Sequence, residues 1–474
     1  MLFNSIEFII FCALFFFFYP YLKEARNRRY AYIIAASCVF YGWWDVRYLF
    51  LLFVCGLIDY FMGYFIYKYP RHKKFFLCFS LVGNLGILFS FKYLLWAVSS
   101  YQQILSSMGM PVSWTENIDP IFKVLPVGIS FYTFQSLSYT FDVYRGELKP
   151  TKNPFLYFCY VSLFPQLVAG PIVRASDILH QLEKPKHPDG EKVFEGLRHI
   201  ASGFFKKVVV ADTLAPFVNS AFASASWDHG AVFWWIAAIA FAFQIYFDFA
   251  GYSDIAIGLG KWMGLDFKMN FNHPYISSSF REFWGRWHIS LSTWFRDYIY
   301  IPLGGSKVST FRAHTNLWIT MLISGLWHGA SFHFLVWGGL HAFYLSMERI
   351  FFPDHRSKNI YFIAMSTLST FLLVCIASVF FRSSSLRHGA GIVKALIDPR
   401  RFSWKEIHDV PVFIIFVIAA VIIRESYVFA QQKAGYKPIA LLSHPVIQSF
   451  VIAFMFFVCL FYRGEGNAFI YFQF

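Results

Sequence analysis

The amino-acid sequence predicts an all-α integral membrane protein, and its composition and the distribution of its apolar segments point that way. Hydrophobic residues make up 57% of the 474 positions and aromatic residues 22%, whereas charged residues make up only 14%. Soluble chains average about 25% charged residues, so this chain lacks the polar surface of a water-soluble protein. Apolar segments run along the whole chain without a linker rich in Pro, Gly or Ser, which predicts one membrane domain over residues 1–474.

The N-terminal segments show a clear alternation of apolar helices and basic loops. A first helix is expected at Ile6–Leu22, retained in the mature protein because no basic segment precedes it. Basic loops follow at Lys23–Arg29 and, two helices later, at Tyr67–Lys74, whereas Ser99–Pro120 has acidic but no basic residues. Because basic loops remain in the cytoplasm, the N-terminus is expected outside. The net charge of +14 is spread over such loops and does not predict nucleic-acid binding.

Further apolar segments bring the expected total to about 10 to 12 transmembrane or re-entrant helices. They are Pro126–Tyr144, Phe155–Val168, Phe194–Phe222, Ala231–Leu259, Asn316–Met347, Ile360–Phe381, Val410–Phe429 and Val446–Tyr462. Leu125–Ser136 and Phe164–Ile172 contain Pro, Gly and polar residues that do not suit a lipid-facing helix. Broken segments are tolerated only where protein or a water-filled cavity surrounds them, so the middle of the chain is expected to enclose a cavity.

The most informative of these segments runs from Thr315 to Met347, with no Asp, Glu, Lys or Arg but with three histidines. A titratable side chain at membrane depth is costly and by default marks a functional site. His328 lies near the middle of the segment, and read as one helix its small or polar neighbours are Ser324, Gly325 and Ser331. They leave space for a ligand beside a neutral imidazole that can act as a base. The alternative is a core histidine bonded to a nearby carbonyl.

A second histidine lies in the basic, tryptophan-rich stretch His273–Gly305. Read as one helix, this stretch places on one face Arg281, Trp284, His288, Ser292 and Phe295. Most of the stretch fits a segment along the cytoplasmic interface, with Arg and Trp at headgroup level. His288 differs because it shares its face with aromatic rings, where an imidazole is partly desolvated.

Two carboxylates and the missing motifs limit the other chemistries. Asp248 and Asp254 line a cavity or cap a broken helix, and the structural role is favoured. HExxH, P-loop, GxSxG and CxxC motifs are all missing from the sequence. His328 and His333, five residues apart, would face different ways on a helix, which argues against a shared metal. No metal site is therefore predicted, and metal-free imidazole chemistry remains.

Several stretches resemble the membrane-bound O-acyltransferase family, in particular the members that acetylate bacterial polysaccharides such as alginate. They are Leu125–Gly146, FPQLVAGPI, FDFAGYSDIAIGLG, Asn270–Tyr275, FREFWGRWHISLSTWFRDYIYIPLGG, LWHGASFHFLVWGGLH and the terminal FIYFQF. The pairing of RWHISLS with LWHGA is highly specific, although neither motif alone would be decisive. The resemblance implies a ring of helices around a central funnel or tunnel. It also implies that His328 is the essential histidine and that His288 is a second histidine of the same site.

The resemblance further implies acetyl transfer across a bacterial inner membrane. Acetyl-CoA is the expected cytoplasmic donor, with no cofactor, and the expected acceptor is a serine on an extracytoplasmic SGNH-type partner or a polysaccharide hydroxyl. His288 would orient the donor thioester or stabilise its oxyanion. Expected substrate contacts are Ser324, Ser331, Trp284 and Ser292, and a basic mouth for the donor phosphates would comprise Arg281, Arg286, Arg296 and Lys307. The alternative for the basic residues is anchoring to anionic headgroups.

Two other functions remain open from the sequence. A D-alanyl transfer protein of the teichoic-acid pathway shares both histidine motifs and takes its acyl group from a carrier-protein thioester. A polysaccharide or lipid transporter would use the same polar cavity, but transporters commonly contain internal repeats. No repeat is evident here, and the histidine pair would then have no role.

Overall fold

The computed structural model describes residues 1–22, 24–110, 112–168, 170–352, 359–437, 439, 444–462 and 469. Secondary structure in this described part is entirely helical, without a strand, so the predicted all-α class is confirmed. The chain divides into two compact units. Unit 1 comprises Met1–Leu197 and Ile255–Lys268, and unit 2 comprises Arg198–Asp254 and Met269–Phe474. The single domain predicted over residues 1–474 stays a prediction.

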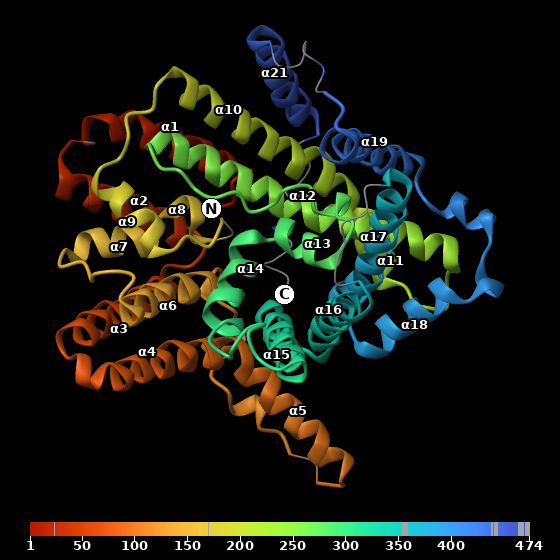
Figure 1. Ribbon diagram of the computed structural model, residues 1–474, viewed down its shortest axis with the longest axis horizontal. Helices are drawn as coiled ribbons and strands as arrows, with labels where there is room; N and C mark the ends of the chain where they lie inside the picture. The colour runs from red at the N-terminus through yellow and green to blue at the C-terminus, as the bar shows by residue number, and fades with distance from the viewer. Residues whose placement is uncertain are drawn as a thin grey trace. The chain divides into compact units, whose positions relative to one another are not determined.

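Unit 1 contains the N-terminal helices, coloured red to yellow in Figure 1. They are α1 (Ile6–Leu22), α2 (Arg26–Gly42), α3 (Leu49–Lys68), α4 (Lys73–Leu88), α5 (Leu94–Ser107), α6 (Ile129–Arg145), α7 (Pro154–Ser162), α8 (Phe164–Leu167) and α9 (Ala175–Glu183). The predicted loop Ser99–Pro120 was placed too early, because its first residues contain no Pro or Gly and continue α5. That helix ends beside Gly109, whose φ of 78° is a left-handed conformation that glycine readily adopts.

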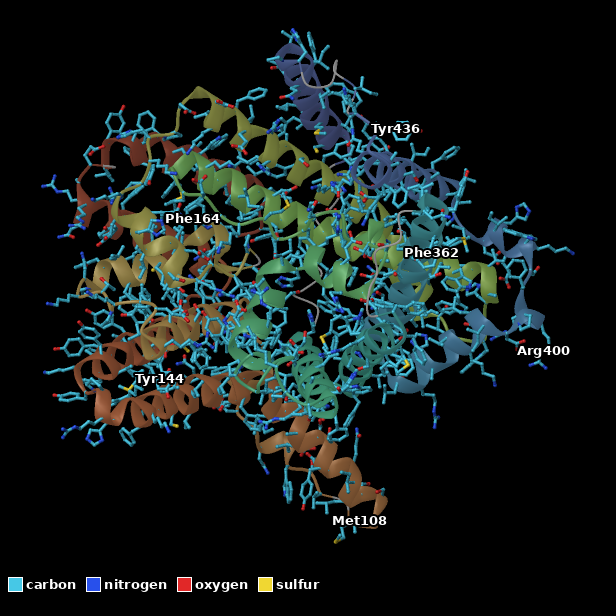
Figure 2. The ribbon with its side chains drawn as sticks, viewed as in Figure 1. Met108, Tyr144, Phe164, Phe362, Arg400 and Tyr436 are labelled. Carbon is cyan, nitrogen blue, oxygen red and sulfur yellow. The ribbon has the colours of Figure 1, made fainter. Side chains whose placement is uncertain are left out.

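Unit 1 is held together by aromatic packing and by one buried carboxylate. Phe164, labelled in Figure 2, is fully buried, and its ring centroid lies 5.0 Å from that of Phe15. Asp59 on α3 is buried and accepts hydrogen bonds from the hydroxyls of Ser80 on α4 and Ser136 on α6. Because a buried charge is costly unless it is hydrogen-bonded, these contacts fix the three helices to one another.

Unit 2 contains the C-terminal helices, coloured green to blue in Figure 1. They are α11 (Asp212–Ala223), α13 (Phe280–Arg286), α14 (Ile289–Phe295), α15 (Thr310–His328), α16 (Phe332–Phe351), α17 (Ile360–Arg382), α18 (Leu386–Ile397), α19 (Val412–Ala434) and α21 (Pro445–Phe461). Two helices belong to both units: α10 (Gly190–Phe204) ends in unit 2, and α12 (Ala231–Met263) begins there.

The core of unit 2 forms around the apolar, largely buried helix α12. Two carboxylates interrupt its apolar sequence, and both are paired. The Asp248 carboxylate lies 2.8 Å from the ammonium of Lys207, and Asp254 pairs with Lys206. Both lysines belong to a π-helical turn at Phe205–Ala211. The structural role favoured for the two aspartates from sequence therefore agrees with the contacts that they make.

The segment predicted as one long helix through His328 is two helices. α15 ends at His328, and α16 starts after Ser331, which has extended backbone angles. Gly329 explains the break, because a Cβ at that position would lie 2.1 Å from the Phe334 ring. The Phe334 ring therefore packs directly against the backbone at Gly329, and the continuous helix that apolar periodicity predicted does not form there.

The stretch His273–Gly305 is also not one helix. α13 ends at Arg286, and α14 begins at Ile289. The intervening His288 has φ 39° and ψ 54°, and the Ile289 N–H donates to the carbonyl of Asn270 at 2.8 Å. The helical hydrogen-bond pattern is therefore interrupted by an outside acceptor. The common face predicted from helical spacing does not exist as such.

Several of the described helices are long and apolar enough to cross a membrane. The candidate spans are Val46–Lys68, Pro70–Ser107, Ala231–Met263, Ile360–Arg382 and Val412–Ala434, with shorter apolar helices at Ile6–Leu22 and Pro445–Phe461. A bilayer core requires about 20 apolar residues in a helix, so the chain is a multi-pass membrane protein. Several other predicted segments, including the one through His328, are short or interrupted helices.

Candidate active site

His288 occupies a strained backbone position inside unit 2. It is one of two residues other than glycine with positive φ among those described, the other being His273. Such a conformation persists only where surrounding contacts enforce it, and it is common at functional sites. The imidazole is fully buried, with its centroid 4.6 Å from the Phe249 ring on α12 and 6.1 Å from the Phe271 ring.

His328 is the last residue of α15 and is also buried. Three aromatic rings meet it nearly edge to face. Its centroid lies 4.9 Å from those of both Trp327 and Trp337 and 5.1 Å from that of Phe381. The helix end at this residue therefore places an imidazole among rings of α15, α16 and α17.

Trp327 brings the two histidines together. Its ring centroid lies 5.9 Å from that of His288 and 4.9 Å from that of His328. The two imidazole centroids can be no further apart than the sum of these distances. That upper limit is below about 12 Å, the separation above which we expect no direct cooperation without a joining cavity, since even a water-bridged catalytic contact is short. The sequence singled out both histidines but gave Trp327 no role, although it lies within the LWHGA motif.

Asn270 is a residue that sequence reasoning missed as part of the site. Its side-chain oxygen lies 3.2 Å from Nδ1 of His288, and its amide nitrogen donates to the Ser253 hydroxyl at 3.1 Å. Asn270 and Ser253 are both buried. The signal was present in the NFNHPY motif, which marked the resemblance but suggested no contact, because the hydrogen bonds depend on the break before Ile289.

His288 is electrically neutral at physiological pH. Burial lowers the pKa of its imidazole to about 3, against the raising effect of a hydrogen bond to its own backbone. Since desolvation disfavours the charged form of histidine, the ring has a lone pair on one nitrogen and a proton on the other. A neutral imidazole can accept a hydrogen bond or a proton, as the chemistry expected from the sequence requires.

The predicted substrate-contact residues lie in different surroundings. Trp284 is not against His288 but against α16, with its ring 5.1 Å from His341 and 5.9 Å from Trp337. The Ser292 hydroxyl donates to the Trp287 carbonyl within its own segment. Ser324 is buried in α15, and Ser331 directly precedes α16.

Gly325 was expected to leave space for a ligand, and this interpretation is wrong. A Cβ at Gly325 would lie 2.3 Å from the Phe334 carbonyl oxygen, so the glycine is in close contact with α16. Its small size serves the approach of two helices. The sequence could not separate this role from ligand space, because both require a missing side chain.

The predicted basic mouth is only partly free to bind a ligand. Arg286 makes a 2.9 Å ion pair with Glu282 and also donates to the Asn272 carbonyl, and Arg296 pairs with Asp297. Arg281 and Lys307 are exposed. Within the described residues, no cluster of His, Cys, Asp and Glu has the composition of a metal site. His333 lies on α16 rather than on the helix of His328, so the spacing on one helix does not apply to this pair.

Two pockets in unit 2 flank α17. One, of about 490 Å³, lies between α16 and α17 and includes Glu348, Tyr344 and Thr370. The other, of about 280 Å³, includes Glu425 and Phe371. Neither has a histidine in its lining. The terminal FIYFQF motif contributes Phe469, whose ring lies 5.5 Å from that of Phe249; Ile470–Phe474 lie outside the described residues.

Comparisons with known proteins point to one family. The model of the membrane-bound O-acyltransferase family matches residues 88–385, which include both histidines. The chain is 43% identical over 370 residues to the probable alginate O-acetylase AlgI of Pseudomonas aeruginosa, covering 77% of this chain and 69% of that protein. It is 32% identical over 397 residues to the peptidoglycan O-acetyltransferase of Helicobacter pylori, covering 77% and 73% of the two chains. Identity to the teichoic acid D-alanyltransferase of Bacillus subtilis is 24% over 353 residues, covering 69% and 82%.

Proposed function

The chain belongs to the membrane-bound O-acyltransferase family and is an O-acyltransferase, and from this premise we propose that it transfers acetyl groups from a cytoplasmic donor to an extracytoplasmic hydroxyl. The proposed donor is acetyl-CoA, and no cofactor takes part. The proposed final acceptor is a polysaccharide, since the chain is 43% identical to a relative named as a probable alginate O-acetylase. Identity to the Bacillus subtilis relative named for teichoic acid D-alanyl transfer is 24%, so a D-alanyl thioester on a carrier protein is the weaker candidate for the donor.

The observation that carries the proposal is the meeting of His288 and His328 around Trp327 in unit 2. In the proposed reaction, His328 accepts the proton of the acceptor hydroxyl as the hydroxyl oxygen attacks the thioester carbonyl. The new C–O bond forms, the C–S bond breaks, and the departing thiolate takes the proton back. The products are an acetyl ester and free CoA thiol. His288 assists at the same centre.

The proposed location is a bacterial inner membrane with an extracytoplasmic N-terminus. This orientation rests on the basic loop at Lys23–Arg29, the basic loop at Tyr67–Lys74 and the acidic loop before Pro120. The donor would then enter from the cytoplasm past Arg281 and Lys307, which are exposed. The binding of acetyl-CoA to the purified protein, with and without neutral substitutions at these two positions, tests the entry route. Unchanged affinity would leave them as headgroup anchors.

The proposed immediate acceptor is a serine of an extracytoplasmic SGNH-type partner, which then acetylates the polymer. The chain carries no GxSxG motif of its own, and its loop between α5 and α6 is short for a glycan groove. The experiment is reconstitution of the purified protein in liposomes with labelled acetyl-CoA inside and alginate outside, with and without the partner. Labelling that requires the partner supports the relay, whereas efficient labelling of polymer without it refutes the relay but keeps the acetyltransferase.

A further inference from the structure

Asn270 makes hydrogen bonds on every side of its amide within unit 2. Its nitrogen donates to the Ser253 hydroxyl at 3.1 Å, and its side-chain oxygen accepts from the Ser290 N–H at 3.2 Å and from the Ser290 hydroxyl at 2.9 Å. The same oxygen lies 3.2 Å from Nδ1 of His288. Its backbone carbonyl accepts from the Ile289 N–H. Because both its nitrogen and its oxygen have partners, the Asn270 amide is held in a single orientation beside His288.

These contacts fix which nitrogen of His288 carries the proton. A backbone N–H can only donate, so the atom of Asn270 that faces Ser290 must be the amide oxygen. The Nδ1 atom of His288 faces that same oxygen, and an amide oxygen can only accept. A hydrogen bond between them requires a proton on Nδ1. In a neutral ring the other nitrogen, Nε2, then has the lone pair.

The surroundings of His288 keep the ring neutral in this state. The elements packed against it present the aromatic rings of Phe249, Phe271 and Trp327. Two titratable groups of α12 and α15 directly adjoin these rings in the sequence. Asp248 precedes Phe249 and pairs with Lys207, and the imidazole of His328 follows Trp327. On the segment of His288 itself, Arg286 pairs with Glu282.

We propose that Asn270 is a positioning residue that holds His288 as the Nδ1–H tautomer, so that Nε2 acts as a hydrogen-bond acceptor toward the substrate. This inference rests on the proposed function and narrows it. A neutral Nε2 with a lone pair cannot donate to an oxyanion, so the oxyanion role expected for His288 is excluded. What remains is orientation of the donor, in which Nε2 accepts from an amide N–H near the thioester, while His328 takes the hydroxyl proton.

The first test reads the tautomer directly and needs no substrate. The full chain, labelled with ¹⁵N-histidine, is placed in lipid vesicles at pH 7, and the signals of His288 are assigned by their loss in His288→Gln. The expected spectrum shows a protonated Nδ1 and an unprotonated Nε2, and Asn270→Ala should populate the other tautomer. A protonated Nε2 in the unsubstituted protein overturns the proposal, as does a tautomer that Asn270→Ala leaves unchanged.

The second test uses the pH dependence of acetyl transfer in the same vesicles, supplied with acetyl-CoA. Asn270→Asp keeps the acceptor oxygen but adds a negative charge, which favours the imidazolium and should move the acid limb of kcat upward by about one pH unit or more. Asn270→Ala should lower kcat about 10- to 100-fold, the range found when the orienting partner of a metal-ligating histidine is removed. An acid limb that does not move in Asn270→Asp would overturn the proposal, because loss of structure alone lowers activity without shifting the limb.

Two controls separate this inference from the proposed function. Ser253→Ala removes the partner on the far side of Asn270 and leaves the contact to His288, so the tautomer and the acid limb should stay unchanged. A shift of either in Ser253→Ala would assign the effect to general disturbance and overturn the inference. An active His288→Gln variant contradicts the proposed function, whereas an inactive one beside fully active Asn270 variants contradicts only the role of Asn270.

Discussion

Replacing Gly338 with alanine should separate two helices that hold the site and thereby slow acyl transfer. α15 and α16 lie against each other in unit 2. Gly338 of α16 faces the backbone of α15, and a Cβ added there would lie 2.4 Å from the Met321 carbonyl oxygen and 3.4 Å from Cα of Gly325. Backbone cannot rotate away as a side chain can. The helices must therefore move.

The size of the effect follows from these distances. Ordinary contact for a Cβ begins near 3.4 Å, so a group at 2.4 Å requires a displacement of roughly 1 Å. Overpacking of this kind destabilises by about 1–3 kcal/mol. The displaced helices carry His328 at the end of α15 and its neighbour Trp337 on α16. Since a misplacement of about 1 Å can slow catalysis about 100-fold, the loss of rate should exceed the loss of stability.

The assay is the initial rate of acetyl transfer in vesicles, divided by the amount of folded protein, together with the midpoint of thermal unfolding. Gly339→Ala is the matched control, because a Cβ there meets only the Trp318 ring at 3.8 Å and a Leu322 methyl at 3.9 Å. Both variants gain the same helix propensity, about 1 kcal/mol. A Gly338→Ala protein as fast as Gly339→Ala would refute the reasoning.

Three further outcomes are expected. His328→Ala should abolish acetyl transfer at normal protein abundance, measured as ester content of the polymer; activity lost only in step with folded protein would instead indicate a core histidine. Asp248→Ala should remove one of the carboxylates that pair with the buried ammonium of Lys207, which lies 2.8 Å from Asp248. The free energy of unfolding should fall by up to about 3 kcal/mol, and an unchanged unfolding midpoint would argue against the ion pair. Burial raises the pKa of Glu282, but hydrogen bonds, chiefly the one from Lys433, outweigh burial and lower this pKa. The stability that Glu282 contributes is therefore fully present above the pKa of about 4.3 that it has in the unfolded chain, and it is lost as the pH falls through its lower pKa in the folded protein. Thermal unfolding between pH 3 and 7 should show a smaller loss of stability at low pH in Glu282→Gln than in the unsubstituted protein.

The fold class and most helix positions could be predicted because apolar runs are local information. Ala231–Leu259, Ile360–Phe381 and Val446–Tyr462 correspond to α12, α17 and α21 with small differences at their ends. Two of the failures occur at Gly329 and His288, where the chain breaks although its apolar periodicity continues. The causes are the Phe334 ring of the following helix and the Asn270 carbonyl of another segment, and neither contact is part of a helical periodicity.

The site was predictable in its histidines and not in its supporting residues. His288 and His328 stand out because an imidazole in an apolar segment needs a reason. Asn270 does not stand out, since an asparagine in a loop is ordinary until its partner Ser290 is known. The same holds for Arg286, whose charge suggested a ligand but which is engaged by Glu282. Charge can be read from the sequence, but the partner that neutralises it cannot.

α16 is a spacer of defined length between the two histidine segments. Near its start Trp337 touches His328, and near its end the Glu348 carboxylate accepts from the backbone N–H groups of Phe280 and Arg281, at the start of α13. Deleting one residue between these contacts would shift Glu348 by about 1.5 Å and turn it by about 100° relative to Trp337. The helix should therefore accept many substitutions at its exposed positions but hardly any single-residue insertion or deletion, so that its residue count matters more than its composition.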